Sequence, residues 1–300
     1  MGSGRRRRRA RTVSAVLLAG LLGVAGCSPG HGTPDAARTA AKKAKPSPAP
    51  VWDRSPSSVA AVGDSITRGF DACTVLSDCP EVSWATGGSP DVDSLAVRLL
   101  GTAGAASHSW NYAVTGSRMA DLPGQMRRAA VRHPQLVTVM MGANDACRAS
   151  TSAMTPVADF RAAFREALAA LHKALPKTQV YVASVPNLKR LWSQGRGNPL
   201  GRQIWKLGIC PSMLADADDL AAGATLRRQR VEARVEAYNA VLKDVCAKTE
   251  RCRFDGGAVF DYRFGTRQLS AWDWFHPSKD GQARLAEIAY RAVTARRPVA

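Results

Sequence analysis

Short apolar runs alternate with stretches of helical periodicity along most of the chain. Continuous apolar runs at 58–63, 135–142 and 178–187 predict buried parallel strands, and 107–114 and 251–260 are weaker strand candidates. Apolar residues at helical spacing are Phe160, Phe164, Leu168, Leu171 and Leu175, then Val231, Val235, Tyr238, Leu242 and Val245, and finally Leu285, Ile288, Ala289 and Val293. This alternation predicts an α/β fold with a central parallel sheet of about five strands and helices on both faces.

The N-terminus has a different pattern. A basic run at residues 5–11 precedes the apolar stretch "VSAVLLAGLLGVAG", which is too short to span a membrane as a helix of about 20 residues. This order predicts a secretory signal over residues 1–26. The ending "VAGC" resembles the lipobox of bacterial lipoproteins, which implies a lipidated Cys27, an exported protein and an anchor on the outer face of the membrane. A plain cleavage site and a soluble secreted protein are the alternative, and paired arginines leave twin-arginine export open.

Residues 27–57 contain the expected lipidated cysteine followed by Pro, Ala, Gly, Ser and Lys in most positions. Such a segment buries little apolar surface, so it predicts a disordered tether. The remaining chain, residues 58–300, is about one domain in length.

The net charge adds little to these predictions of fold and export. Removing the six arginines of residues 1–26 from the whole-chain charge of +18 leaves +12. Lys and Arg are spread along the mature chain without a nucleic-acid motif or an aromatic-interleaved patch, so no nucleic-acid partner is expected.

Six cysteines remain beside Cys27, and export would place them in an oxidising compartment. Six cysteines allow 15 pairings. Sequence proximity favours Cys73–Cys79 and Cys246–Cys252, which leaves Cys147–Cys210 as a long bridge. No CxxC pair or adjacent histidine supports a zinc site instead.

Residues 188–226, here called the cover, interrupt the strand–helix rhythm. A loop of this length is usually functional or disordered. We interpret it as a cover over the active site, attached through Cys210 to Cys147, and its apolar residues would bind an acyl chain. A structural flap without substrate contact is the alternative. The apolar residues concerned are Trp192, Ile204, Trp205, Leu207, Met213 and Leu214.

Polar and glycine residues follow three successive predicted strands, in "GDSIT", "AVTGS" and "GANDAC". Sites of open parallel sheets lie at the carboxyl ends of the strands. With "DWFHPSKDG" near the C-terminus, these blocks resemble, in order, the four motifs of the SGNH/GDSL hydrolases. The resemblance covers residues 58–300. It implies a flavodoxin-like α/β/α sandwich that hydrolyses esters with no metal or cofactor. The implied site residues are Ser65, Gly116, Asn144, Asp273 and His276.

The chemistry of these residues agrees with the resemblance. A serine hydroxyl is a weak nucleophile until a base takes its proton, and His276 is the base candidate for Ser65. Asp273 would orient His276 and stabilise the imidazolium. An oxyanion also needs fixed donors. The family implies the backbone N–H of Ser65, the backbone N–H of Gly116 and the side-chain amide of Asn144.

Neighbouring residues have simpler expected roles. Asp64 would support the turn, Asn111 would brace the second block, and Trp272 and Trp274 would pack rather than line the pocket.

The leading hypothesis is a serine ester hydrolase working through an acyl-Ser65 intermediate, either an esterase or lipase or a carbohydrate O-deacetylase. A non-catalytic surface lipoprotein on the same scaffold is the alternative. An ester substrate is therefore the expected partner.

Overall fold

The computed structural model describes residues 51–298. Its centre is one five-stranded sheet in the order β2-β1-β3-β4-β5, with every neighbouring pair parallel. The strands are β1 (Val59–Gly63), β2 (Ser109–Asn111), β3 (Leu136–Met140), β4 (Gln179–Val182) and β5 (Cys252–Phe254). This is the flavodoxin-like strand order, so the predicted fold class and strand number are confirmed.

The central strands are the ones with continuous apolar sequence. Every residue of β1, β3 and β4 is buried, whereas the edge strands β2 and β5 are mostly half-buried. Parallel strands covered on both faces carry mostly apolar side chains on both sides. The register pairs Gly63 with Met140, so β1 and β3 end at the same level.

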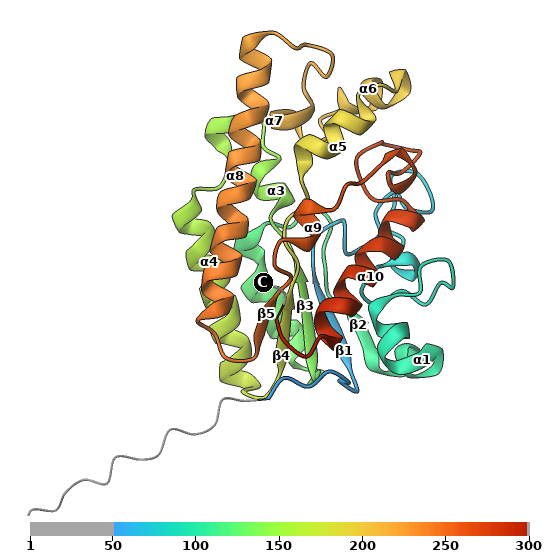
Figure 1. Ribbon diagram of the computed structural model, residues 1–300, viewed down its shortest axis with the longest axis vertical. Helices are drawn as coiled ribbons and strands as arrows, with labels where there is room; N and C mark the ends of the chain where they lie inside the picture. The colour runs from blue at the N-terminus through green and yellow to red at the C-terminus, as the bar shows by residue number, and fades with distance from the viewer. Residues whose placement is uncertain (1–50, 299–300) are drawn as a thin grey trace, which may run out of the picture. The chain divides into compact units, whose positions relative to one another are not determined.

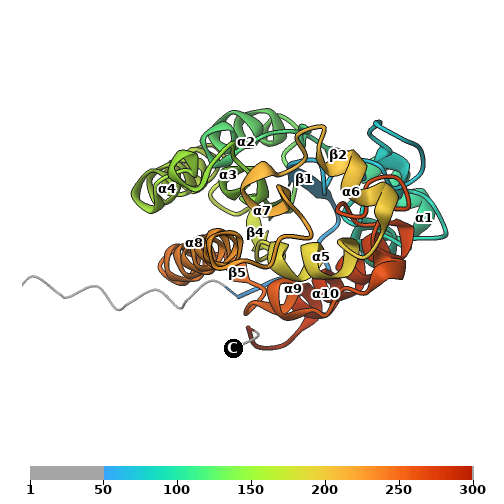
Figure 2. The ribbon, with the colours of Figure 1, turned by 90° about the horizontal axis from the view of Figure 1, so that it is seen from above.

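Helices cover both faces of the sheet (Figure 1). Viewed along the sheet in Figure 2, α1 and α10 lie on one face, and α2, α4 and α8 lie on the other. The helices are α1 (Leu95–His108), α2 (Leu122–Ala130), α3 (Ala143–Ala146), α4 (Val157–Ala174), α5 (Leu188–Gly195), α6 (Pro199–Trp205), α7 (Pro211–Leu214), α8 (Ala222–Ala247), α9 (Ala258–Asp261) and α10 (Lys279–Thr294). The predicted three-layer arrangement is therefore observed.

The predicted helical faces point into the core. Phe160 of α4 stacks on Tyr238 of α8 with ring centroids 4.1 Å apart. The other predicted apolar positions are buried, except Leu175 and Ile288, which are half-buried and pack against the core. Leu175 lies just beyond the end of α4.

The folded domain begins earlier than residue 58. The indole Nε1 of Trp52 donates to the carbonyl oxygen of Val293 at 2.8 Å, and the Arg253 guanidinium lies 4.3 Å from the centre of the Trp52 ring. The amide of Gln179 also exchanges two hydrogen bonds with the backbone of Asp53. Residues 52 and 53, which were predicted to belong to the tether, therefore contact the folded domain, where the half-buried indole of Trp52 has a specific partner.

The predicted signal at 1–26, Cys27 and the first part of the tether lie outside the described residues. Within residues 51–298, no helix combines the length and apolar character needed to cross a membrane.

The cover is helical rather than loop-like. It contains α5, α6, α7 and the first turn of α8, which gather beyond the carboxyl ends of the strands (Figure 1). Asn187 caps α5 by accepting from Arg190 N, and Asn198 caps α6 ahead of Pro199. Asn at the cap and Pro at the first helical position are strong signals for the start of a helix, so these helices could have been predicted from the sequence.

Candidate active site

Ser65 lies directly beyond the end of β1, between the turns that follow β2 and β3. In this strand order, the point between β1 and β3 is where the connections diverge and ligands bind. The backbone must pass very close to the neighbouring strand there, because a Cβ on Gly63 would lie 2.5 Å from the carbonyl oxygen of Met140. Glycine is therefore required just before the serine turn.

Three side chains form a continuous hydrogen-bonded chain. The Oγ of Ser65 lies 2.9 Å from Nε2 of His276, and Nδ1 of His276 lies 2.5 Å from Oδ2 of Asp273. The other carboxylate oxygen of Asp273 accepts from the backbone N–H groups of Phe275 and His276, each at 2.9 Å. The fold thus brings residues 65, 273 and 276 into the geometry that nucleophile, base and orienting acid require.

The electrostatics favour the charged forms of both His276 and Asp273. Burial alone would lower the pKa of His276, but the negative charge of Asp273 and the hydrogen bond to it raise that pKa above its ordinary value, with further help from Asp71 and Asp64. Burial likewise opposes ionisation of Asp273. The charge and hydrogen bonds of His276, with the backbone N–H groups, nevertheless hold the pKa of Asp273 below its ordinary value. The charged, imidazolium form of His276 is therefore stabilised by the Asp273 carboxylate.

Amide side chains fix the turn that carries Ser65. Gln125 pairs with Gly63, accepting from its N–H at 2.8 Å and donating to its carbonyl at 2.9 Å. Gln282 donates to the carbonyl of Ile66 at 2.8 Å. Asn111 donates to the carbonyl of Thr67 at 3.0 Å, as predicted for a brace. The roles of the two glutamines were not predicted, because their local sequence does not distinguish them from surface residues.

Asp64 supports this turn as expected. One of its oxygens accepts from the N–H of Ile66 at 3.0 Å, and its side chain is buried. Burial raises the pKa of Asp64 to about 7, although the hydrogen bond from Ile66 and the charge of His276 act in the opposite direction.

The second and third blocks lie beside Ser65. Gly116 has a φ of 83°, a conformation that favours glycine. The Nδ2 of Asn144 donates to the carbonyl of Ser117 at 2.9 Å. A primary amide has two N–H donors, so one donor of Asn144 is left for a ligand. Among the described residues, the backbone N–H groups of Ser65 and Gly116 have no protein acceptor.

A pocket of about 210 Å³ opens over these groups. Its floor contains Ser65, Gly116, Asn144 and His276. The walls are mostly apolar and come partly from the cover: Ile66, Ala143, Leu188, Leu191, Ile209, Phe275 and the Cys147 and Cys210 pair. The side chains of Ser65, His276 and Asn144 thus face one mostly apolar hollow.

The large aromatic residues of the cover do not line this pocket. Trp192 and Trp205 are buried within the cover and its base, and Nε1 of Trp205 donates to the carbonyl of Asp273 at 2.7 Å. None of the six apolar cover residues predicted to bind an acyl chain lines this pocket, and the apolar side chains that the cover places there belong to Leu188, Leu191 and Ile209. Trp274 packs against Gly201, as predicted. Trp272 is 45% exposed, contrary to the prediction that it packs.

One buried arginine organises the far end of the cover. Arg228 of α8 is only 2% exposed and lies 4.2 Å from the Trp192 ring centre. Its guanidinium donates to backbone carbonyls, among them Asp216 at 2.6 Å and Asp219 at 2.7 Å. Sequence reasoning missed Arg228 because a single arginine in a basic helix normally lies in solvent.

All three predicted disulfides are present: Cys73–Cys79, Cys147–Cys210 and Cys246–Cys252. Cys147–Cys210 joins the turn after β3 to the cover across 63 residues. Loop-closure entropy assigns about 4 kcal/mol to a bridge of that span. The cover is therefore attached covalently beside the pocket.

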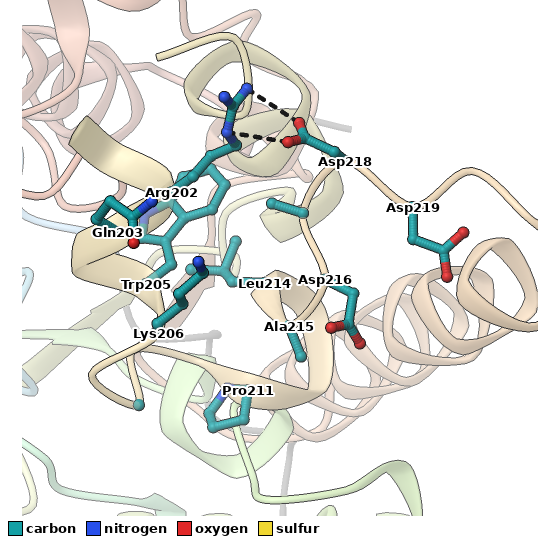
Figure 3. A pocket seen from close by; sticks show the side chains of 12 residues that line it. Arg202, Gln203, Trp205, Lys206, Pro211, Leu214, Ala215, Asp216, Asp218 and Asp219 are labelled. Atoms are coloured by element: carbon teal, nitrogen blue, oxygen red, sulfur yellow. Dashed lines mark hydrogen bonds and ion pairs between the residues drawn. The ribbon is translucent and has the colours of Figure 1, made fainter. Parts of the chain in front are cut away.

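A larger hollow of about 600 Å³ lies within the cover, between α6 and the segment around α7 (Figure 3). An ion pair of 3.0 Å between Arg202 and Asp218 crosses it. It contains neither Ser65 nor His276, and it meets the smaller pocket only at Gly208. Without a nucleophile and base, this hollow is not the candidate site.

Within residues 51–298, two groups of side chains have the spacing of metal ligands. Cys73 and Cys79 of the first group are bonded to each other. In the second group, Asp71, Asp273 and His276, both ring nitrogens of His276 already have hydrogen-bond partners, namely Asp273 and Ser65. Both ring nitrogens are therefore already engaged by protein side chains.

A sequence model described as GDSL-like Lipase/Acylhydrolase matches residues 59–289. The chain belongs to this family. No curated protein sequence gives a significant match.

Solved structures similar to this GDSL-family chain have low sequence identity. An extracellular lipase from Streptomyces rimosus is 18% identical and covers 77% of this chain and 99% of its own, with a TM-score of 0.41. A family 3 carbohydrate esterase from Clostridium thermocellum is 14% identical and covers 78% of this chain and 93% of its own, with a TM-score of 0.46. Both lipases and carbohydrate esterases are thus among the similar structures.

Proposed function

We propose that this GDSL-family chain is a carboxylic ester hydrolase that works through an acyl-Ser65 intermediate. The observation that carries the proposal is the hydrogen-bonded chain from Ser65 through His276 to Asp273, placed at the floor of a pocket. The family supports hydrolase chemistry, and the geometry supports these residues in the reacting roles.

In the proposed mechanism, Nε2 of His276 takes the proton of Ser65 as Oγ attacks the ester carbonyl. Asp273 holds the Nδ1 proton, which fixes the tautomer and stabilises the imidazolium. His276 then returns its proton to the leaving alcohol. Water repeats the sequence on the acyl-enzyme, which releases the acid and restores Ser65.

Negative charge on the carbonyl oxygen needs donors that are already in place. We assign this role to the N–H groups of Ser65 and Gly116 and the second Nδ2 hydrogen of Asn144. Asn144 is held by its bond to Ser117, and Asp145 beside it accepts from Met119 N at 2.9 Å. Donors fixed in this way need little reorganisation as charge develops, which supports catalysis.

The pocket favours a short acyl chain over an acetylated sugar. Its walls are mostly apolar, so they offer few partners to sugar hydroxyls. A pocket of about 210 Å³ suits a short chain better than a palmitoyl chain. Esterase activity on short acyl esters is therefore the proposed specificity.

Hydrolysis of nitrophenyl esters from acetyl to palmitoyl by the full-length chain tests the proposal. We expect a maximum at a short acyl chain longer than acetyl, and no turnover by Ser65→Ala. A maximum at acetyl would favour the carbohydrate O-deacetylase, and absence of hydrolysis at every length would favour a non-catalytic surface protein.

Export and anchoring through Cys27 are part of the proposal. Three disulfides among the six described cysteines support an oxidising compartment. Metabolic labelling with a palmitate analogue should mark the wild-type chain but not Cys27→Ser. Equal labelling of both would contradict the anchor at this residue.

A further inference from the structure

A second carboxyl group lies against His276 and Asp273 of the candidate site. Asp71, Asp273 and His276 each place a polar side-chain atom so that all three atoms lie within 4.8 Å of one another. Asp71 is 1% exposed, and its Oδ2 is buried without a hydrogen-bond partner among the described residues. Two charged carboxylates at this distance repel each other, and a proton held between them removes that repulsion.

The surrounding loop holds Asp71 in this position. Its backbone has a φ of 57°, in the left-handed region that non-glycine residues rarely adopt. Its N–H donates to the carbonyl of Ser77 at 3.0 Å, and its carbonyl accepts from Oγ of Ser270 at 2.6 Å. Ser270 N also donates to the carbonyl of His276 at 2.8 Å. The loop is closed by Cys73–Cys79, so Asp71 is fixed relative to His276.

We propose that Asp71 is a positioning residue of the candidate active site. In weakly acidic solution its carboxyl is protonated and donates a hydrogen bond to the Asp273 carboxylate. In neutral solution it releases that proton to solvent and places a second negative charge behind His276. This inference rests on the proposed function for the test that measures activity, whereas the NMR titration tests it without activity.

The charges around Asp71 agree with this role. Burial and then the charge of Asp273 raise the pKa of Asp71 to about 6. The N–H of Leu76 and the charge of His276 oppose this rise. Asp64 is the other carboxyl that acts on His276. Charged side chains lining the hollow beside Asp71 are Arg267, Lys279 and Asp280.

The proposal fixes the sign of one pH effect. An ionised Asp71 raises the pKa of His276, and His276 must be neutral to accept the proton of Ser65. Asp71→Asn keeps a hydrogen-bond donor for Asp273 but removes the charge. The acid limb of kcat/KM should therefore move to lower pH by about 1 unit. Asp159→Asn, which removes an exposed carboxylate at the start of α4, should leave the limb in place.

The imidazole Cε1 proton of His276, followed by NMR in the full-length chain, tests the same point without activity. In the wild type, the chemical shift of this proton should change in two steps, one from His276 itself and one from Asp71. In Asp71→Asn it should change in a single step, at a lower pH than the His276 step of the wild type. One step in the wild type would overturn the proposal even if Asp71→Asn failed to fold. An unshifted acid limb in a folded Asp71→Asn, with or without a lower kcat, would also overturn it and would indicate a structural role.

Discussion

The strand-end turns and the cover meet over one pocket but are built differently. The turn after β1 is fixed by hydrogen bonds from buried amides, as Gln125 pairs with both backbone groups of Gly63. The cover is held by apolar packing, by Arg228 and by the Cys147–Cys210 bridge. The turns supply the polar atoms of the pocket, while the cover supplies Leu188, Leu191 and Ile209.

This difference separates two tasks. Reacting groups must be held within a fraction of an ångström, and rigid strand ends with paired backbone groups provide that precision. Acyl chains need only apolar walls of suitable size, which a helical insertion can provide without precise polar geometry. Changes in the turns should therefore lower kcat for every ester, whereas changes in the cover should alter the preference among esters.

The largest effect is expected at the acid that orients the base. Asp273→Asn should lower kcat about 10⁴-fold at neutral pH, because the amide favours the wrong tautomer of His276. Steady-state hydrolysis of a butyryl ester measures this. Asp255→Asn is the matched control, because Asp255 is equally buried but bonds to Ser184 after β4. A folded Asp273→Asn with nearly full kcat would contradict the assigned role.

A smaller loss is expected at the side-chain oxyanion donor. Asn144→Ala should lower kcat about 10²- to 10³-fold for all acyl lengths, because one donor to the developing charge is lost. Kinetics on acetyl and octanoyl esters would show an equal loss on both. Asn198→Ala, which removes the cap of α6 in the cover, should reduce thermal stability and leave kcat nearly unchanged. A change confined to KM would argue against Asn144 as an oxyanion donor.

The cover should affect selectivity by about one order of magnitude. Ile209→Trp would fill part of the pocket and should lower kcat/KM for octanoyl relative to acetyl esters about 10-fold. Leu207→Trp serves as control, since Leu207 is two residues away and 75% exposed. Equal behaviour of the two variants would show that the cover does not contact the acyl chain.

The sequence predicted the sheet and the strand-end turns well, and the cover less well. Buried strands and the four motif blocks each carry a local pattern, so the positions of Ser65, Asn144 and His276 followed from spacing and order. The contacts that hold them come from distant residues. Gln282 reaches Ile66 from α10, and Arg228 reaches carbonyls of the cover from α8. Such pairings depend on the tertiary fold and leave no local sequence pattern.

The role of Asp71 also lay beyond the sequence. It follows the serine turn by only six positions, where an aspartate ordinarily belongs to a solvated loop. The fold brings it against Asp273 and His276, which lie near the other end of the sequence.

Covalent labelling of the nucleophile tests the central claim most directly. The full-length chain is treated with a fluorophosphonate at neutral pH, digested and analysed by mass spectrometry. We predict one adduct, on Ser65, formed quickly in the wild type, very slowly in His276→Ala and not at all in Ser65→Ala. Labelling of another residue, or no labelling of a correctly folded wild type, would contradict the assignment of Ser65 as the nucleophile.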